Sequence, residues 1–233
     1  MSFRELFRPG ARWLPVAGVV ALALGSAEPI AARAPATTKE ETMSLPPLTA
    51  GRVSLDDALR RRRSVRVFAA RALSSEHVGQ LCWAAQGITE PAAGLRTAPS
   101  AGALYPLELY VVLPDGVFRY EPRAHRLRRI DATDQRVVLS RATLGQDAVR
   151  LASADLVITA ALSRTRAKYG DRAERFAHLE AGHAAQNVLL EATSLGLAAV
   201  PIGAFDDGDV RRAIGAPADE LPLYVIAIGH PTD

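Results

Sequence analysis

The apolar run between Asp155 and Leu162 limits the fold of this chain more than any other segment. Its residues, Leu156-Val157-Ile158-Thr159-Ala160-Ala161, contain no charged side chain and no alternation of polar and apolar positions. A strand with this pattern has both faces covered, as the central strands of a layered domain do. The run therefore predicts a buried strand at the centre of a sheet.

Strand and helix signals alternate along the rest of the chain. A strand over residues 107–113 is followed by the turn Asp115-Gly116 and a strand over residues 117–120, which together indicate a hairpin. Further strands are predicted over residues 197–202 and 223–228, and helices after Ser54, from Ser74 or Ser75 to Gly87, over residues 173–195, and from about Asp207. The fold class predicted is α+β, a mixed β-sheet flanked by helices.

The longest predicted helix, residues 173–195, has one stripe of mainly small side chains. The stripe consists of Ala177, Ala181, Ala184, Val188, Ala192 and Leu195. Because small side chains let two backbones approach, we expect this helix to pack closely against another helix. His183 lies among the alanines of this helix, and this spacing favours a packed structural histidine over a ligand.

The first 53 residues are predicted to lie outside the folded domain, which would span residues 54–233. Residues 1–27 resemble a signal peptide, with Arg4, Arg8 and Arg12 before an uncharged stretch that is too short for a stable membrane span. This predicts an exported or periplasmic protein. Translation from Met43 is the alternative and predicts a cytoplasmic one. Residues 28–53 are rich in Ala, Pro and Thr and are predicted to be a flexible linker.

Charge and cysteine content exclude several classes of function. The net charge is +3, and four arginines and two glutamates in residues 1–34 account for two of these charges. The rest of the chain is thus close to neutral, and no nucleic-acid partner is expected. Cys82 is the only cysteine, so internal disulfides and cysteine-rich zinc sites are excluded. Its apolar neighbours predict a small core residue. We find no Ser-His-Asp arrangement and no metal cluster.

Arginines gather where the first predicted helix meets a strand. The cluster runs from Arg60 to Arg63 and continues with Ser64 and Arg66. Guanidinium groups offer paired donors to an oxyanion, so the cluster suits a phosphate. A solvated helix end that interacts with the helix dipole accounts for the same residues equally well. A nucleic-acid patch is disfavoured because no aromatic residues are interleaved.

Two segments of small residues adjoin predicted strands. Residues 99–102 lead into the strand at 107, and residues 201–204 lie at the end of the strand predicted over residues 197–202. Small side chains allow backbone N–H and C=O groups to approach a flat ligand. Taken alone, each segment is more typical of an ordinary loop or turn than of a ligand site.

Taken together, the three segments resemble the nitroreductase superfamily. The first resembles the phosphate-binding signature R-R-S-x-R, and the third resembles the V-P-I-x-x-F segment beside the flavin. The second, from Pro99 to Glu108, is close to the string P-S-A-G-A-L-Y-P-L-E of SagB/ThcOx-type dehydrogenases. Residues 81–89 and 180–187 also agree, so the resemblance spans about Ser54 to Gly229.

The resemblance implies an FMN-binding intertwined homodimer with each site built from both chains. Arg62, Arg63, Ser64 and Arg66 would hold the phosphate and ribityl chain; Pro99, Ser100, Ala101 and Gly102 would line the isoalloxazine; Pro201, Ile202, Gly203 and Ala204 would cover its other side. The small-residue stripe would meet its symmetry mate at the subunit interface. The chain has no G-x-G-x-x-G fingerprint, which favours FMN over FAD.

The implied reaction is two-electron transfer between NAD(P)H or an organic donor and a nitro, quinone or similar small-molecule acceptor. Azoline dehydrogenation in peptide natural-product maturation is an alternative, and a non-catalytic flavin-binding dimer is another. In azoline-oxidising relatives a Lys-Tyr pair is proposed to act beside the ring, which makes Lys168 and Tyr169 catalytic candidates. A surface loop before the long helix is the competing interpretation of this pair.

Two positions depart from the pattern of the family. Many classical nitroreductases carry Glu where Gly203 stands, so flavin tuning and the substrate pocket are expected to differ here. Many also place a C-terminal basic arm on the phosphate, whereas this sequence ends at Asp233 without one. The cluster around Arg62 would then carry that charge alone.

Overall fold

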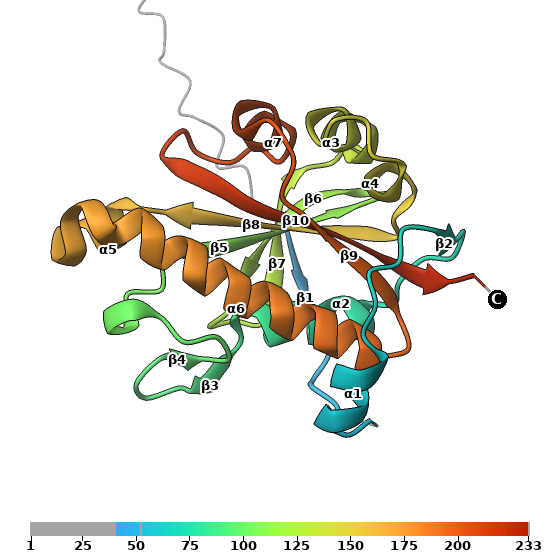
Figure 1. Ribbon diagram of the computed structural model, residues 1–233, viewed down its shortest axis with the longest axis horizontal. Helices are drawn as coiled ribbons and strands as arrows, with labels where there is room; N and C mark the ends of the chain where they lie inside the picture. Colours follow the sequence, from blue (N-terminus) through green and yellow to red (C-terminus); the bar gives the residue numbers. More distant parts are fainter. Residues whose placement is uncertain (1–40, 52, 233) are drawn as a thin grey trace, which may run out of the picture. The chain divides into compact units, whose positions relative to one another are not determined.

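The computed structural model describes residues 41–51 and 53–232 (Figure 1). The predicted signal peptide and residues 28–40 of the predicted linker lie outside this range. The helices are α1 (Leu55–Arg61), α2 (Ser75–Gln86), α3 (Arg136–Ala142), α4 (Asp147–Leu151), α5 (Ser163–Tyr169), α6 (Ala173–Ser194) and α7 (Asp207–Ala213). The strands are β1 (Thr42–Ser44), β2 (Phe68–Ala69), β3 (Ile88–Glu90), β4 (Leu95–Arg96), β5 (Leu107–Leu113), β6 (Gly116–Glu121), β7 (Arg126–Asp131), β8 (Ala154–Ala161), β9 (Ala198–Ile202) and β10 (Glu220–Pro231).

The apolar run predicted as a central strand is β8, and all eight of its residues are buried. The main sheet has the strand order β1-β7-β6-β5-β8-β10-β2, and β9 pairs with the opposite side of β10. Every named strand pair among the described residues is antiparallel, and Ser64 adds a single parallel bridge to Ala199. The predicted α+β class and the hairpin at Asp115-Gly116 are confirmed, with antiparallel pairing dominating the sheet.

Helices cover both faces of the sheet, as its apolar central strand requires. Along β8, Leu156 and Ile158 face a core that includes α2 and α6, and Val157 faces a second core with α3, α4 and α7. Figure 1 shows α6 crossing one face and α3, α4 and α7 grouped on the other. The alternation of side chains along a strand accounts for the two cores.

Short side chains bring α6 close to its neighbours within the chain. Ala177, Ala181, Ala184, Val188 and Ala192 are all at most 1% exposed in the core shared with α2 and the sheet. Close packing against another helix is thus confirmed, but the expected contact of this stripe with a symmetry mate is wrong. The pattern of small side chains predicted a closely packed neighbour but could not identify it. In the structure, that neighbour is α2 together with the sheet. The helix ends as predicted, with Gly196 at φ 71°.

Residues 42–45 differ from the predicted flexible linker. Thr42–Ser44 form β1, which pairs with β7, and the N–H of Leu45 donates to the carbonyl of His125 at 3.1 Å. Leu45 is buried in the core beside α2. A three-residue edge strand is too short to show a hydrophobic period. Because the surrounding stretch is rich in Ala, Pro and Thr, its composition predicted a linker instead.

Asp155 is a buried carboxyl group on β8. Its side chain is fully buried, and neither carboxylate oxygen has a hydrogen-bond partner among the described residues. Burial raises the pKa of Asp155 well above its ordinary value, and the positive charge of Arg136 only partly opposes this. The neutral acid is therefore the form that the folded chain favours.

Replacing Asp155 with Asn should make stability less dependent on pH. Because the folded-state pKa is raised, the stabilising contribution of the neutral acid is present at low pH and is lost as pH rises toward the folded pKa. Asp155→Asn cannot ionise, so we expect it to be more stable than the parent at pH 8, by about 1–3 kcal/mol, and similar at pH 4. Urea unfolding at both pH values measures this. Asp115→Asn, an exposed control, should retain the slope of the parent; an equal slope in Asp155→Asn would contradict the interpretation.

Candidate active site

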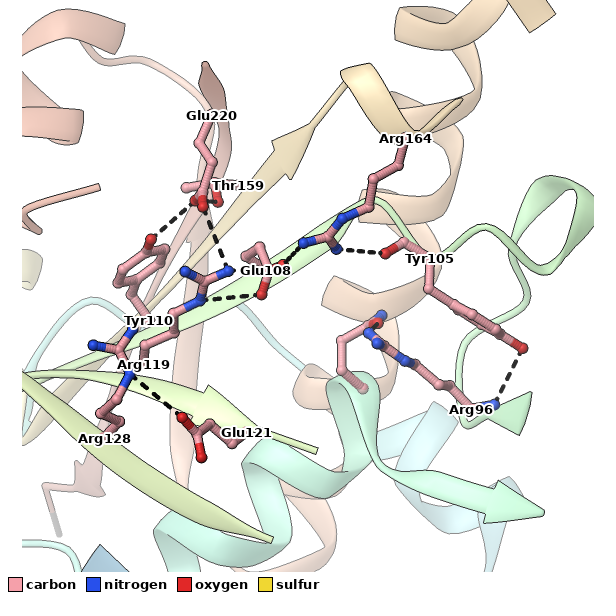
Figure 2. Close-up of polar contacts among 11 residues, drawn as sticks. Arg96, Tyr105, Glu108, Tyr110, Arg119, Glu121, Arg128, Thr159, Arg164 and Glu220 are labelled. Atoms are coloured by element: carbon pink, nitrogen blue, oxygen red, sulfur yellow. Dashed lines mark hydrogen bonds and ion pairs between the residues drawn. The ribbon is translucent and has the colours of Figure 1, made fainter. Parts of the chain in front are cut away.

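The loop from Pro99 to Tyr105 has an unusual backbone. Gly102, Ala103 and Tyr105 all have positive φ, at 62°, 53° and 48°. Left-handed conformations cost non-glycine residues roughly 1–2 kcal/mol each, so the surrounding contacts must hold this loop in place. The backbone N–H of Tyr105 donates to the hydroxyl of Ser100 at 2.9 Å, and the guanidinium of Arg164 donates to the carbonyl of Tyr105 at 3.0 Å (Figure 2).

A buried carboxylate from α6 fixes the start of this loop. Glu180 is 5% exposed, and its Oε1 accepts the backbone N–H of Ala101 at 2.9 Å. Burial raises the pKa of Glu180, and hydrogen bonds from Ala101 and Ser100 oppose that rise. Glu180 was not among the site residues predicted from the sequence. The available signal was its position three residues after Ala177, which places an acidic side chain on the buried face of the helix.

Lys168 and Tyr169 lie against the same loop. A Cβ atom added to Gly102 would lie 2.8 Å from Lys168 Nζ and 2.9 Å from the Tyr169 hydroxyl. Both residues belong to the last turn of α5, and the ring of Tyr169 stacks edge-on against Phe176 with centroids 4.9 Å apart. The chain thus brings two predicted site segments together, 66 residues apart in sequence between Gly102 and Lys168.

A small cavity adjoins this loop. Its volume is about 280 Å³, and it is lined by Pro99, Ser100, Ala101, Phe176, Leu179, Glu180 and His183. His183 is exposed, so its prediction as a packed structural histidine is wrong. The adjacent Ala184 and Ala181 are fully buried, and a side chain at position 183 lies on the flank of the helix that turns away from them.

The arginine segment, residues 60–66, lies at the opposite end of α6 from the loop of residues 99–105. Arg62 caps the C-terminus of α1, and Arg63 Nη1 donates to the backbone carbonyls of Arg60 and Arg62 at 2.8 and 2.9 Å. The side chain of Arg63 therefore binds backbone carbonyls at the C-terminal end of α1. Arg62 and Arg66 form no ion pair with the residues that the structure describes. Their guanidinium groups are therefore available to bind an anion.

Strand β9 connects the arginine segment to residues 201–204. The bridge from Ser64 to Ala199 and the bond from Val65 N–H to the Ala199 carbonyl, at 3.0 Å, hold the arginines beside the start of β9. The strand ends at Ile202, and Gly203 and Ala204 are exposed. A Cβ atom added to Gly203 would meet no atom within 4 Å, so the space beside this backbone is open.

One chain does not bring all of these segments to one place. Leu55 and Ala58 of α1 share a cavity with Leu190 and Ser194 near the C-terminal end of α6. Residues 99–101 instead contact Glu180, fourteen residues earlier, which is roughly 21 Å along the helix axis. Figure 1 likewise shows α1 and α5 at opposite ends of α6.

Residues 41–51 and 53–232 contain neither a membrane-spanning helix nor a metal cluster. No helix there is long and apolar enough to cross a membrane, and no group of three or more His, Cys, Asp or Glu side chains could hold a metal ion. Cys82 is fully buried, and burial raises the pKa of its thiol. Its prediction as a core residue is confirmed.

Comparison with protein families finds one match over most of the chain. The model of the "Nitroreductase family" matches residues 59–230. An inferred nitroreductase of Methanocaldococcus jannaschii is 40% identical over 184 residues, which cover 76% of this chain and 91% of that protein.

Solved structures agree with this family. The crystal structure of an inferred nitroreductase from Ralstonia eutropha has a TM-score of 0.76 and 33% identity, and the match covers 84% of this chain and 92% of that one. A chain of the Escherichia coli microcin synthetase McbBCD complex, solved with truncated pro-MccB17 bound, has a TM-score of 0.64 and 24% identity. That match covers 84% of this chain and 80% of the other, and it shows a shared fold.

Proposed function

This chain belongs to the nitroreductase family, and on that basis we propose that it is an FMN-dependent oxidoreductase of the SagB/ThcOx type. Electrons would pass from NAD(P)H or an organic donor to a nitro, quinone or similar acceptor. FMN, when bound, supplies the hydride transfer, and the protein supplies placement and electrostatics. The observation that carries the proposal is the closeness of Lys168 and Tyr169 to Gly102, which brings two family segments together.

The residues of the chain fit this cofactor. Arg62 and Arg66 have guanidinium groups without carboxylate partners among the described residues, as a terminal phosphate requires. Gly102 has a left-handed backbone, and the backbone at Gly203 is open, so a flat ring can approach main-chain groups at both segments. Lys168 is an exposed residue with its Nζ beside Gly102, and it is placed to hold or deliver a proton to a bound substrate.

We further propose that the site is completed in a homodimer. The segments at Arg62 and Gly102 lie at opposite ends of α6, so a second chain is needed to bring both kinds of segment to one flavin. Apolar side chains are available for such an interface, since Leu55 and Leu59 of α1 and Leu179 of α6 are more than half exposed. We therefore propose that this exposed surface, rather than the alanine stripe of α6, forms the contact between subunits.

The cofactor proposal has a direct test. The purified protein should show a flavin absorption spectrum, and mass analysis of the released cofactor should identify FMN. Under anaerobic conditions NADPH, or failing that an organic reductant, should bleach the flavin, and a quinone should restore the colour. Recovery of FAD or of protein without flavin would contradict the proposal. Coloured protein that no reductant and acceptor can cycle would instead indicate a non-catalytic flavin-binding dimer.

Leu55→Glu with Leu59→Glu should lower both dimer fraction and flavin content. Two charges would enter an apolar interface, and because the dimer and the bound flavin stabilise each other, flavin occupancy should fall about tenfold at micromolar protein. Light scattering combined with the ratio of flavin to protein absorbance measures both. Leu151→Glu on α4, also half exposed, is the matched control. A parent protein that is monomeric yet fully flavinated would refute the shared site.

Azoline dehydrogenation is a second candidate, and a specific observation favours it. The string from Pro99 to Glu108 is close to that of SagB/ThcOx-type enzymes, and the fold is shared with a chain of a microcin synthetase complex solved with a pro-peptide. Oxidation of an azoline-containing peptide by the purified protein, monitored as a loss of two mass units, would distinguish this activity from quinone or nitro reduction.

Export of the protein is a separate proposal, which rests on the resemblance of residues 1–27 to a signal peptide.

A further inference from the structure

A second cavity lies where strands β5, β6 and β7 meet, and the proposed flavin chemistry does not use it. Its volume is about 410 Å³. Five arginines line it, and we call it the arginine pocket: Arg96 of β4, Arg119 of β6, Arg123 of the β6–β7 turn, Arg128 of β7 and Arg164 of α5. The volume falls within the range of small-molecule sites, roughly 300–1,000 Å³.

Carboxylates near the arginine pocket are already shared between arginines. Glu108 binds Arg119 at 2.8 Å and also binds Arg164, and Glu121 binds Arg128 (Figure 2). Glu121 also binds Arg126, at 2.6 Å. Only these two glutamates line the cavity, so its lining has fewer carboxylates than guanidinium groups.

A third carboxylate, that of Glu220, lies next to the pocket and pairs with Arg119. It lies 3.6 Å from Arg119, but it also accepts the hydroxyls of Tyr110 and Thr159 at 3.0 and 2.6 Å. Glu220 is buried and is a counter-charge for Arg119, and it forms no ion pair with Arg96 or Arg123.

Arg96 and Arg123 have no carboxylate partner among the described residues. Arg96 donates to the side-chain oxygen of Gln86 at 2.7 Å and stacks on the ring of Tyr105, 4.8 Å from its centre. Its Nε is buried without a hydrogen-bond partner. Burial lowers the pKa of Arg96, with Glu108 opposing, as expected for a guanidinium that has lost water without gaining an adjacent anion. Arg123 is exposed on the β6–β7 turn at the same cavity.

We propose that the arginine pocket binds a small multivalent oxyanion, a metabolite that carries a phosphate group or several carboxylates. Guanidinium groups present forked donors that match the oxygens of phosphate and carboxylate. Arg96 and Arg123 supply the donors that no carboxylate of the pocket occupies. Two guanidinium groups without a carboxylate partner favour a ligand with more than one negative charge, because a partly enclosed positive cluster is costly without a counter-ion. The site does not depend on the flavin proposal.

Isothermal titration of the purified protein tests the site. Sodium pyrophosphate and sodium citrate are titrated separately, with sodium chloride holding the ionic strength constant. We expect one ion to bind per chain, and we expect Arg123→Glu to weaken binding about tenfold or more, since it removes a charge-assisted donor and adds a repelling charge. Arg123 is exposed, so this variant should fold. Arg96→Gln should weaken binding as well.

Two controls separate this site from others. Arg141→Glu changes an exposed arginine of α3 outside the pocket and should retain the affinity of the parent. Arg62→Ala with Arg66→Ala should also retain it, which distinguishes the arginine pocket from the proposed flavin-phosphate segment. Preference for pyrophosphate would indicate a phosphorylated ligand, and preference for citrate a polycarboxylate. The proposal is overturned if neither ion binds, if Arg123→Glu binds like the parent, or if either control weakens binding equally.

Discussion

Replacing Arg62 and Arg66 together with alanine should lower the affinity for FMN by about 100-fold to 10,000-fold. Each charge-assisted hydrogen bond to the phosphate contributes about 1.5–3 kcal/mol, and two are lost. The fold should be unaffected, because neither guanidinium forms an ion pair with the described residues. Fluorescence titration of the cofactor-free protein with FMN measures the dissociation constant, and urea unfolding checks the fold.

A neighbouring arginine provides the matched control. Arg60 pairs with Asp57 at 2.9 Å on the exposed side of α1, so Arg60→Ala should alter FMN affinity little. If the double variant of Arg62 and Arg66 binds FMN as tightly as the parent, the phosphate site lies elsewhere. If Arg60→Ala weakens binding as strongly as the double variant, general positive charge rather than specific phosphate contacts explains the result.

Lys168→Met should reduce turnover about 100-fold to 10,000-fold while leaving flavin content unchanged, because general acid–base groups typically contribute that much. Tyr169→Phe keeps the ring that stacks on Phe176 and removes the hydroxyl beside Gly102, so it tests the hydroxyl alone. Steady-state rates with the donor and acceptor found for the parent enzyme measure both effects. A dependence of kcat on pH that disappears in Lys168→Met would tie the lysine to proton transfer.

Arg166→Met is the control for Lys168, since Arg166 is exposed on the same helix, two residues away. It should leave kcat within about twofold of the parent. Unchanged kcat in both Lys168→Met and Tyr169→Phe would remove the pair from the chemistry. Their contact with Gly102 would then serve only to hold the loop.

Local patterns in the sequence were sufficient for most elements of the fold. The apolar run of β8 and the starts of the helices after Ser54 and at Ser74 or Ser75 depend on residues within one or two turns of each other, and the structure has each of them where it was predicted. Strand β1 was missed because an edge strand of three residues is held by its partner β7 rather than by its own composition.

The candidate site was less accessible from sequence because its contacts are long-range. No periodicity predicts that Gly102 meets Lys168, or that Glu180 accepts the N–H of Ala101, 79 residues away. The same limit explains the error over the alanine stripe of α6: small side chains indicate a close neighbour, and only the three-dimensional arrangement identifies it as α2 and the sheet. Exposure of His183 likewise depends on which flank of α6 faces outward.

The loop from Ser100 to Tyr105 also has a consequence for engineering. Its left-handed residues are held by Glu180 and Arg164, so substitutions within it should cost folding before they alter selectivity. The connection after α5 is different, because a Cβ atom added to Gly170 would meet nothing within 4 Å, although its φ of 54° disfavours other residues there. Libraries that seek new substrates should therefore vary Leu179 and His183 at the cavity wall, and place insertions beside Gly170.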